Sequence, residues 1–150
     1  MGVMRGTTAA AVAAAVFSAK AAAHPPVPET AADAAGPVVI RYDERVRKEE
    51  PGPHEGGGQT TANRYFDDVP DPKLIFRRRA LHPGAAIGVH KLRHDEVYYV
   101  LAGHGELTVD ELVTEVVAGA AIYLREGAAV GIRTLGEADL EIIIAYPPFE

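Results

Sequence analysis

The stretch that decides the fold is residues 84–103, GAAIGVHKLRHDEVYYVLAG, in which a charged turn separates two short apolar segments. These segments, residues 86–90 and 96–101, are rich in Val, Ile, Leu and Tyr, and Gly84 and Gly103 bound the pair. Segments of this composition between glycine-containing turns are typical of β-strands. The stretch therefore predicts two consecutive strands.

The same pattern continues on both sides of this stretch, in short apolar segments that end at turns containing Gly or Pro. After the N-terminal leader, no segment has apolar residues at helical spacing over enough length to predict a helix. Short strands at regular spacing are typical of a sandwich or a barrel, so the predicted fold class is all-β. The further expected strands are residues 38–42, 74–81, 106–110, 115–117, 120–124, 130–133 and 140–146.

The strand at residues 96–101 is apolar on both faces, because Val97, Tyr99 and Leu101 alternate with residues that are also largely apolar. A strand in an open sheet normally leaves one face wet. We expect one face to line the barrel and the other to meet a second sheet or a second subunit. With the apolar run at residues 140–144, this pattern predicts a homodimer.

Composition excludes several classes of function. The chain has 15 Lys and Arg against 21 Asp and Glu, for a net charge of −6, which argues against nucleic acid as a partner. It has no cysteine, which excludes a disulfide scaffold, a thiolate zinc site and a cysteine nucleophile.

The N-terminal residues have the order of a secretory signal. Arg5 precedes an apolar run at residues 8–17, and SAKAAA at residues 18–23 offers small residues where a signal peptidase cleaves. The run is shorter than the roughly 20 residues that span a bilayer, so no membrane span is expected after cleavage. Alternatives are a disordered alanine-rich leader and an amphipathic helix. We predict a signal peptide at 1–23, a linker at 24–37, a single domain at 38–150, and a periplasmic or secreted protein.

Residues 47–63, RKEEPGPHEGGGQTTAN, combine charge with Pro and three consecutive Gly. This composition predicts a loop that is long for a compact domain, either mobile or a lid. His54 lies within it, and an exposed loop histidine is the favoured interpretation over a ligand.

Four residues of the opening stretch have the spacing of a known motif: Gly84, His90, Glu96 and Gly103. With the string DEVYYVLAG they resemble the first motif of the cupin superfamily, and residues 119–136, GAAIYLREGAAVGIRTLG, resemble an eroded second motif. The resemblance spans residues 84–136. It implies a double-stranded β-helix, a small jelly-roll barrel that is usually dimeric and has a pocket inside. The strand count and turn spacing indicate a barrel independently.

The same resemblance implies a divalent metal ion held by two His and a Glu of the first motif and one His of the second. His90 matches the first histidine and Glu96 the carboxylate, but Leu92 and Val130 occupy the other two positions. Neither side chain has a lone pair, and catalytic metal sites generally keep three protein ligands. The prediction is no cofactor, or a weakly bound divalent ion of unresolved identity among Zn, Fe, Ni and Mn.

A substitute histidine is the remaining way to complete such a site. His94 lies in the turn between His90 and Glu96, and the parity of these positions puts it on the inward side. His104, after the next turn, is the weaker substitute. The alternative is that both are exposed turn residues, as we expect for His82.

Three further polar side chains are candidates for ligand contact. Tyr98 shares the inward parity of Glu96, and Tyr123 lies in a strand that normally borders the cavity. Arg79, with Arg77 on the same face, has the planar guanidinium that binds a carboxylate through two hydrogen bonds. The alternatives are ordinary core positions for the tyrosines and outer-face solvation for the arginines.

Three functions are compatible with these residues. The favoured one is a cell-envelope protein that binds a small polar molecule in the barrel, with His90, Glu96 and Tyr98 available for acid/base chemistry of the isomerase type without metal. The second is a metal-dependent isomerase, lyase or oxygenase that uses His90, Glu96 and His94. The third is a non-catalytic dimeric scaffold, because the fold alone does not choose among them.

Overall fold

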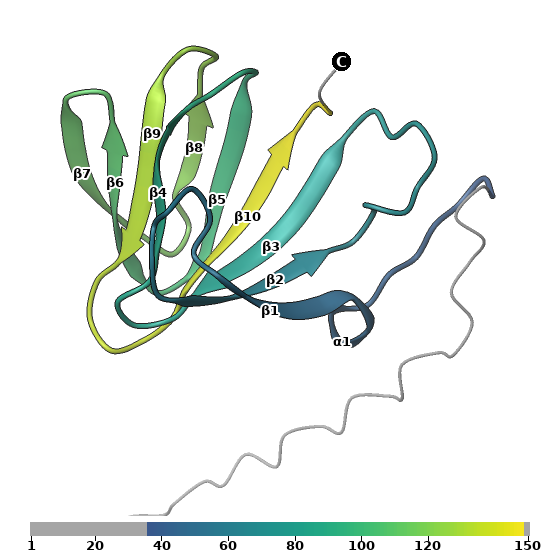
Figure 1. Ribbon diagram of the computed structural model, residues 1–150, viewed down its shortest axis with the longest axis horizontal. Coiled ribbons are helices and arrows are strands. Elements are labelled where there is room, and N and C mark those ends of the chain that lie inside the picture. Colours follow the sequence, from purple (N-terminus) through teal and green to yellow (C-terminus); the bar gives the residue numbers. More distant parts are fainter. Residues whose placement is uncertain (1–35, 149–150) are drawn as a thin grey trace, which may run out of the picture.

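The computed structural model describes residues 36–148, which form ten strands and one short helix (Figure 1). The elements in chain order are α1 (Asp43–Val46), β1 (Arg47–Pro51), β2 (Gln59–Arg64), β3 (Ile75–Leu81), β4 (Ala86–Lys91), β5 (Glu96–Ala102), β6 (His104–Val109), β7 (Leu112–Val117), β8 (Ala121–Leu124), β9 (Ala129–Thr134) and β10 (Leu140–Tyr146).

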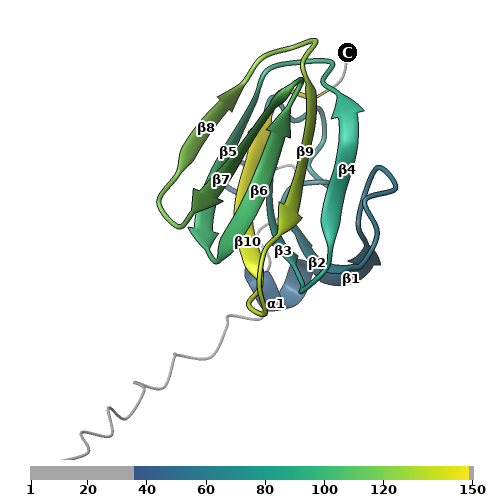
Figure 2. The same ribbon diagram turned by 90° about the vertical axis from the view of Figure 1, so that its left-hand side faces the viewer.

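The strands form two antiparallel sheets that face each other, as Figures 1 and 2 show. One sheet has six strands in the order β1-β2-β3-β10-β5-β8, and the other has four in the order β4-β9-β6-β7. From β3 onward, every strand overlaps one that the sequence predicts. The all-β fold class and the jelly-roll architecture are confirmed.

The register of β3, β10 and β5 makes the two ends of the sandwich different. Ile144 of β10 lies opposite Arg77 of β3 on one side and Tyr98 of β5 on the other. Inward-facing positions therefore change from apolar to polar toward the same end of all three strands. At the apolar end the fully buried core includes Leu81, Val100, Leu140 and Ile142. At the other end the inward side chains include Arg77, Arg79, Glu96, Tyr98 and Tyr146.

The segment before β3 differs from the prediction. Residues 38–42 form no strand, and Val38 and Ile40 are exposed. Residues 47–63, predicted as one loop, contain β1 and most of β2, joined by the loop at residues 52–58.

Strand β2 buries polar side chains on both of its faces, which is why apolar periodicity does not reveal it. Its buried Thr60, Thr61 and Asn63 bond to residues of the preceding segment. Thr60 donates to the carbonyl of Glu50, and Asn63 donates from its amide to the carbonyl of Asp43. These hydrogen bonds satisfy polar groups that would otherwise be costly to bury.

The outer face of β5 remains partly uncovered. Val97, Tyr99 and Leu101 are 39–41% exposed, while Glu96, Tyr98 and Val100 are buried on the inner face. The strand therefore carries apolar side chains on both faces, as the sequence predicts. The homodimer stays a prediction.

The predicted signal peptide, residues 1–23, and all but the end of the linker lie outside the described residues. Export and envelope location stay predictions. Within residues 36–148, no helix has the length and apolar character needed to cross a membrane.

Candidate functional site

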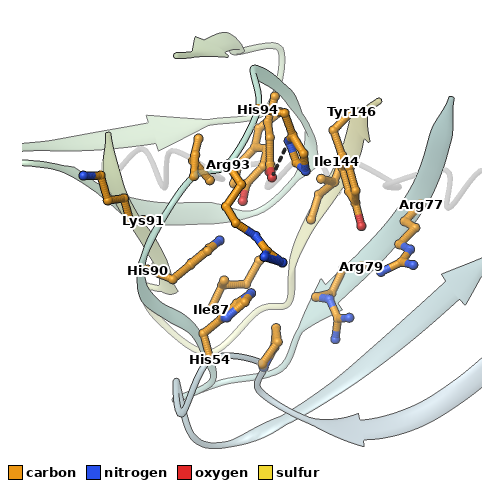
Figure 3. A pocket seen from close by; sticks show the side chains of 14 residues that line it. His54, Arg77, Arg79, Ile87, His90, Lys91, Arg93, His94, Ile144 and Tyr146 are labelled. Carbon is orange, nitrogen blue, oxygen red and sulfur yellow. Dashed lines mark ion pairs between the residues drawn. The ribbon is translucent and has the colours of Figure 1, made fainter. Parts of the chain in front are cut away.

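A pocket of about 300 Å³ opens at the polar end of the sandwich (Figure 3). This volume is at the lower end of the range for small-molecule sites. Its walls come from both sheets, from the turn between β4 and β5, and from the loop between β1 and β2. Its ionisable lining contains one carboxyl group, Glu96, with three histidines and four cationic side chains: His54, His90, His94, Arg77, Arg79, Lys91 and Arg93.

Glu96 is the buried acid of this pocket. Its residue is only 7% exposed, and burial raises the pKa of the carboxyl, while the charges of His94 and His90 act in the opposite direction. The Nδ1 atom of His94 lies 3.5 Å from Oε1 of Glu96, as the dashed line in Figure 3 marks. Burial favours the neutral carboxyl, so Glu96 is placed to donate a proton or a hydrogen bond into the pocket.

Two tyrosines contact this pair: Tyr98 is the neighbour of Glu96, and Tyr146 is the neighbour of His94. Tyr98 is 1% exposed, and its pKa is raised by burial and by the neighbouring Glu96 charge. The ring of Tyr146 stacks on His94, with centroids 4.8 Å apart and planes 9° from parallel. Burial also raises the pKa of Tyr146. Both hydroxyls therefore stay protonated and serve as neutral hydrogen-bonding groups.

His90 lies on β4 directly opposite Val130 of β9. Its Nδ1 is 2.9 Å from the carbonyl oxygen of Gly88. Because a carbonyl only accepts, Nδ1 carries the proton and Nε2 is the atom left for a ligand. The ring also stacks on His54, with centroids 3.6 Å apart and planes 5° from parallel. Burial, the charge of His90 and the charge of Arg79 lower the pKa of His54.

The residues present do not fit the metal ion that the resemblance implies. Leu92 is 3% exposed and Val130 is 0% exposed, and both belong to the hydrophobic core. Among residues 36–148, no three His, Asp or Glu side chains come together as a set that would hold a metal ion. His90, Glu96 and His94 share one pocket, but the ligand set proposed from them is not assembled.

The four cations of the pocket have different partners. Arg79 is 5% exposed and donates to the hydroxyl of Thr60 at 2.7 Å and to Glu50 at 2.5 Å. Arg77 pairs with Asp67 at 3.2 Å and lies over the ring of Tyr146. Both guanidinium groups line the pocket but are already bonded to the protein. The arginines share the inward face, so outer-face solvation is wrong for this pair.

Lys91 and Arg93 are the exposed cations of the pocket, and both come from the end of β4 and the turn after it. In the view of Figure 3, Arg93 extends from this turn toward the middle of the ring of lining residues, while Lys91 lies at its edge. Long cationic side chains at a pocket rim keep their charge in water and can close on an anion.

Two predicted residues lie outside the pocket, Tyr123 and His104. Tyr123 is 61% exposed, points away from the pocket and donates to Asp95, so the expectation that it lines the cavity is wrong. Its strand is short, and alternation puts Tyr123 on the outer face beside buried Leu124. His104 pairs with Glu115 at 2.8 Å outside the pocket. His94, in contrast, is inward, and the alternative of an exposed turn residue is wrong for it.

Sequence reasoning missed four charged or aromatic residues of the pocket: His54, Lys91, Arg93 and Tyr146. The parity of β10 places Tyr146 on the same face as Leu140, Ile142 and Ile144, and this signal was present in the sequence. No local pattern distinguishes Arg93 or His54 from ordinary surface residues of a turn and a loop.

Comparison with known proteins agrees with this fold. Residues 77–146 match the family profile described as the cupin domain. A curated relative, the oxalate-binding protein of Thermotoga maritima, is 31% identical over 70 residues, which are 46% of this chain and 58% of that protein. The matched part therefore spans less than two thirds of that relative.

Solved structures show the same architecture. A predicted oxalate decarboxylase from Thermotoga maritima aligns with a TM-score of 0.67 at 24% identity, over 75% of this chain and 100% of that one. A cupin 2 conserved barrel domain protein from Rhodopseudomonas palustris aligns with a TM-score of 0.61 at 15% identity, over 73% of this chain and 79% of that one. At these identities the likeness shows the fold alone.

Proposed function

The chain belongs to the cupin superfamily, and we propose that it binds a small carboxylate in the pocket at the polar end of its barrel, without a metal ion. The observation that carries this proposal is the charge of the pocket lining: four cationic side chains and three histidines surround one buried carboxyl group. The name of the related oxalate-binding protein supports the same class of ligand.

The binding mode follows from the surroundings of each group. Lys91 and Arg93 approach an anion from the rim, and Arg93 has the planar guanidinium that pairs with a carboxylate through two hydrogen bonds. In its protonated form, which burial favours, Glu96 donates a further hydrogen bond to the bound anion. Leu92 and Val130 fill the space that the missing metal ligands would occupy, so the positive charge comes from side chains instead.

Calorimetry with chelator-treated and dialysed protein tests this proposal. Oxalate should bind and neutral oxamide should not, because only the carboxylate gains from the cationic rim. Lys91→Gln and Arg93→Gln should each weaken oxalate binding by about tenfold, the effect of losing one charged hydrogen bond. Lys73→Gln is the matched control, since Lys73 is an exposed lysine that pairs with Asp71 and lies outside the pocket.

Two results would contradict the proposal in different ways. Binding that disappears on chelation and returns with Zn²⁺ or Mn²⁺ would support the metal-dependent alternative. If no small carboxylate binds, with or without metal, the non-catalytic dimeric scaffold would be the remaining function.

An acid/base reaction on the bound ligand is a second candidate function. It is favoured by one observation, the raised pKa of Glu96 next to the imidazole of His94. A carboxyl that is neutral near the working pH is suited to proton transfer. Chemical analysis of the ligand recovered from the same incubations tests it, and Glu96→Gln should abolish any conversion while leaving binding measurable.

A further inference from the structure

The loop between β1 and β2, residues 52–58, is here called the hairpin tip. It lies along β4, the edge strand of the four-stranded sheet. The N–H of Gly88 donates to the carbonyl of Pro53 at 3.0 Å, and the N–H of Ala86 donates to the carbonyl of Gly57 at 3.2 Å. The hairpin begins in the six-stranded sheet, so its tip bridges the two sheets beside the pocket.

The tip and β4 approach so closely that two glycines are required. A Cβ atom on Gly56 would lie 2.1 Å from the carbonyl oxygen of Ala86, and one on Gly88 would lie 1.9 Å from that of His54. Neither contact is sterically allowed, and each involves backbone that cannot turn away. The docked position of the tip therefore requires glycine on both contacting segments, at Gly56 of the tip and at Gly88 of β4.

The backbone of the tip is also held in an unusual conformation. His54 and Glu55 have φ of 54° and 60°, in the left-handed region that residues other than glycine rarely adopt. Such residues persist where surrounding contacts determine them, and they are concentrated at ligand clamps. Here the conformation brings the His54 ring onto the ring of His90.

The hairpin is joined to the pocket at its base as well as at its tip. Arg79, from the pocket wall, donates to Thr60 of β2 and to Glu50 of β1. Pro53 and His54 line the pocket themselves. All of these hairpin residues lie outside residues 77–146, the part of the chain that matches the cupin domain.

We propose that the hairpin tip is the wall that limits the length of the ligand, and that His54 is the residue a longer ligand would meet. This inference rests on the proposed binding of carboxylates. Two backbone hydrogen bonds, an interlocked glycine contact and a ring stack fix the wall, so a longer ligand must displace it or stay outside. The hairpin thereby makes this chain select short diacids over long ones.

Calorimetry with a series of linear diacids, oxalate, succinate and adipate, tests the inference. The variants are His54→Ala, which shortens the wall, and Gly56→Ala, which forces the tip away from β4. In both, the preference for oxalate over adipate should fall by about tenfold, the discrimination that a pocket wall provides for a ligand of excess length. Lys48→Ala is the control, because Lys48 is exposed on the same hairpin and does not line the pocket.

Amide hydrogen exchange at Gly88 provides a readout without ligand. It should be slow in the wild type and in Lys48→Ala, and much faster in Gly56→Ala, because the partner carbonyl of Pro53 is then lost. Equally fast exchange in the wild type would show that the tip is not docked, which overturns the inference.

The two proposals fail differently. If the wild type binds diacids and both tip variants keep its oxalate-to-adipate ratio, the wall is not the determinant and only this inference falls. If the wild type binds no diacid, the proposed function is wrong and the inference falls with it. If Gly56→Ala does not fold, the oxalate-to-adipate ratio of His54→Ala alone tests the inference.

Discussion

Two histidine–carboxylate pairs lie on opposite faces of the six-stranded sheet. In the pocket, His94 is 3.5 Å from Glu96, and the two side chains are 11% and 9% exposed. On the outer side, His82 is 3.0 Å from Asp139, and these side chains are 30% and 39% exposed. The residue types are nearly the same, but the surroundings are not.

Burial decides how the two pairs differ. In the pocket it raises the pKa of the Glu96 carboxyl, which favours the neutral acid. On the outer face, the hydrogen bond to Asp139 is the largest effect and raises the pKa of His82, which favours the ion pair. An exposed pair therefore carries two charges that water stabilises, whereas the buried pair holds a proton that a ligand can share.

The largest expected effect comes from changing the apolar wall beside the inner pair. Leu92→His with Val130→His should lower the free energy of unfolding by about 2 to 4 kcal/mol without metal, because two imidazoles replace core side chains. If His90 and Glu96 point at one spot, Zn²⁺ should restore stability, by about 2.7 kcal/mol at a hundredfold excess over Kd. Thermal unfolding with and without zinc measures both effects.

The unmodified protein is the control for zinc and should not be stabilised. An equal gain in the unmodified protein would mean that a metal site exists without the two added imidazoles. No gain in the double variant would mean that His90 and Glu96 face different points.

The next effect concerns Glu96 itself. A raised folded-state pKa means that its contribution to stability is present below the unfolded pKa, near 4.5, and is lost as the pH rises through the folded pKa. Glu96→Gln removes the buried charge and should be more stable than the wild type at pH 7 by on the order of 1 kcal/mol. The difference should shrink below pH 4. Urea unfolding at both pH values measures it.

Asp139→Asn is the matched change in the outer pair and should have the opposite sign. It removes the carboxylate that stabilises charged His82, so it should destabilise the protein where His82 is protonated. The comparison between the two pairs breaks down if both variants shift stability in the same direction at pH 7.

The smallest effect is expected for His82→Gln. Because the folded-state pKa of His82 is raised, its stabilising contribution is present below the unfolded pKa, near 6.5, and is lost as the pH rises through the folded pKa. The variant should lose less than about 1 kcal/mol at pH 5.5, since the pair is solvated, and should match the wild type at pH 9. A loss that is equal at both pH values would point to packing instead of charge.

Strands β3 to β10 were predictable because each carries apolar residues with the period of a strand. The same periodicity placed Glu96, Tyr98 and His94 on the inward side, where the pocket lies. Leu92 and Val130 were recognised as unable to bind metal from their chemistry alone, and both lie in the core.

The hairpin of β1 and β2 was not predictable in this way. Its strands, RKEEP and QTTANR, have no apolar alternation. Ion pairs and hydrogen bonds to β3 and between the two strands stabilise them instead. His54 reaches His90 only because the tip docks on the edge of β4. Contacts between segments so distant in the sequence leave no local signal.

The sequence by itself determined the all-β class, the barrel motif, the inward parity of β5 and the apolar residues at two of the implied ligand positions, because each depends on residue type and short-range spacing. Only the tertiary structure decided that His54 joins the pocket, that Arg79 is bonded to the hairpin, and that Tyr123 faces outward. It also decided which histidine–carboxylate pair is buried. These features depend on which distant strands become neighbours, and the packing of those neighbours sets both the burial and the charge state of each group.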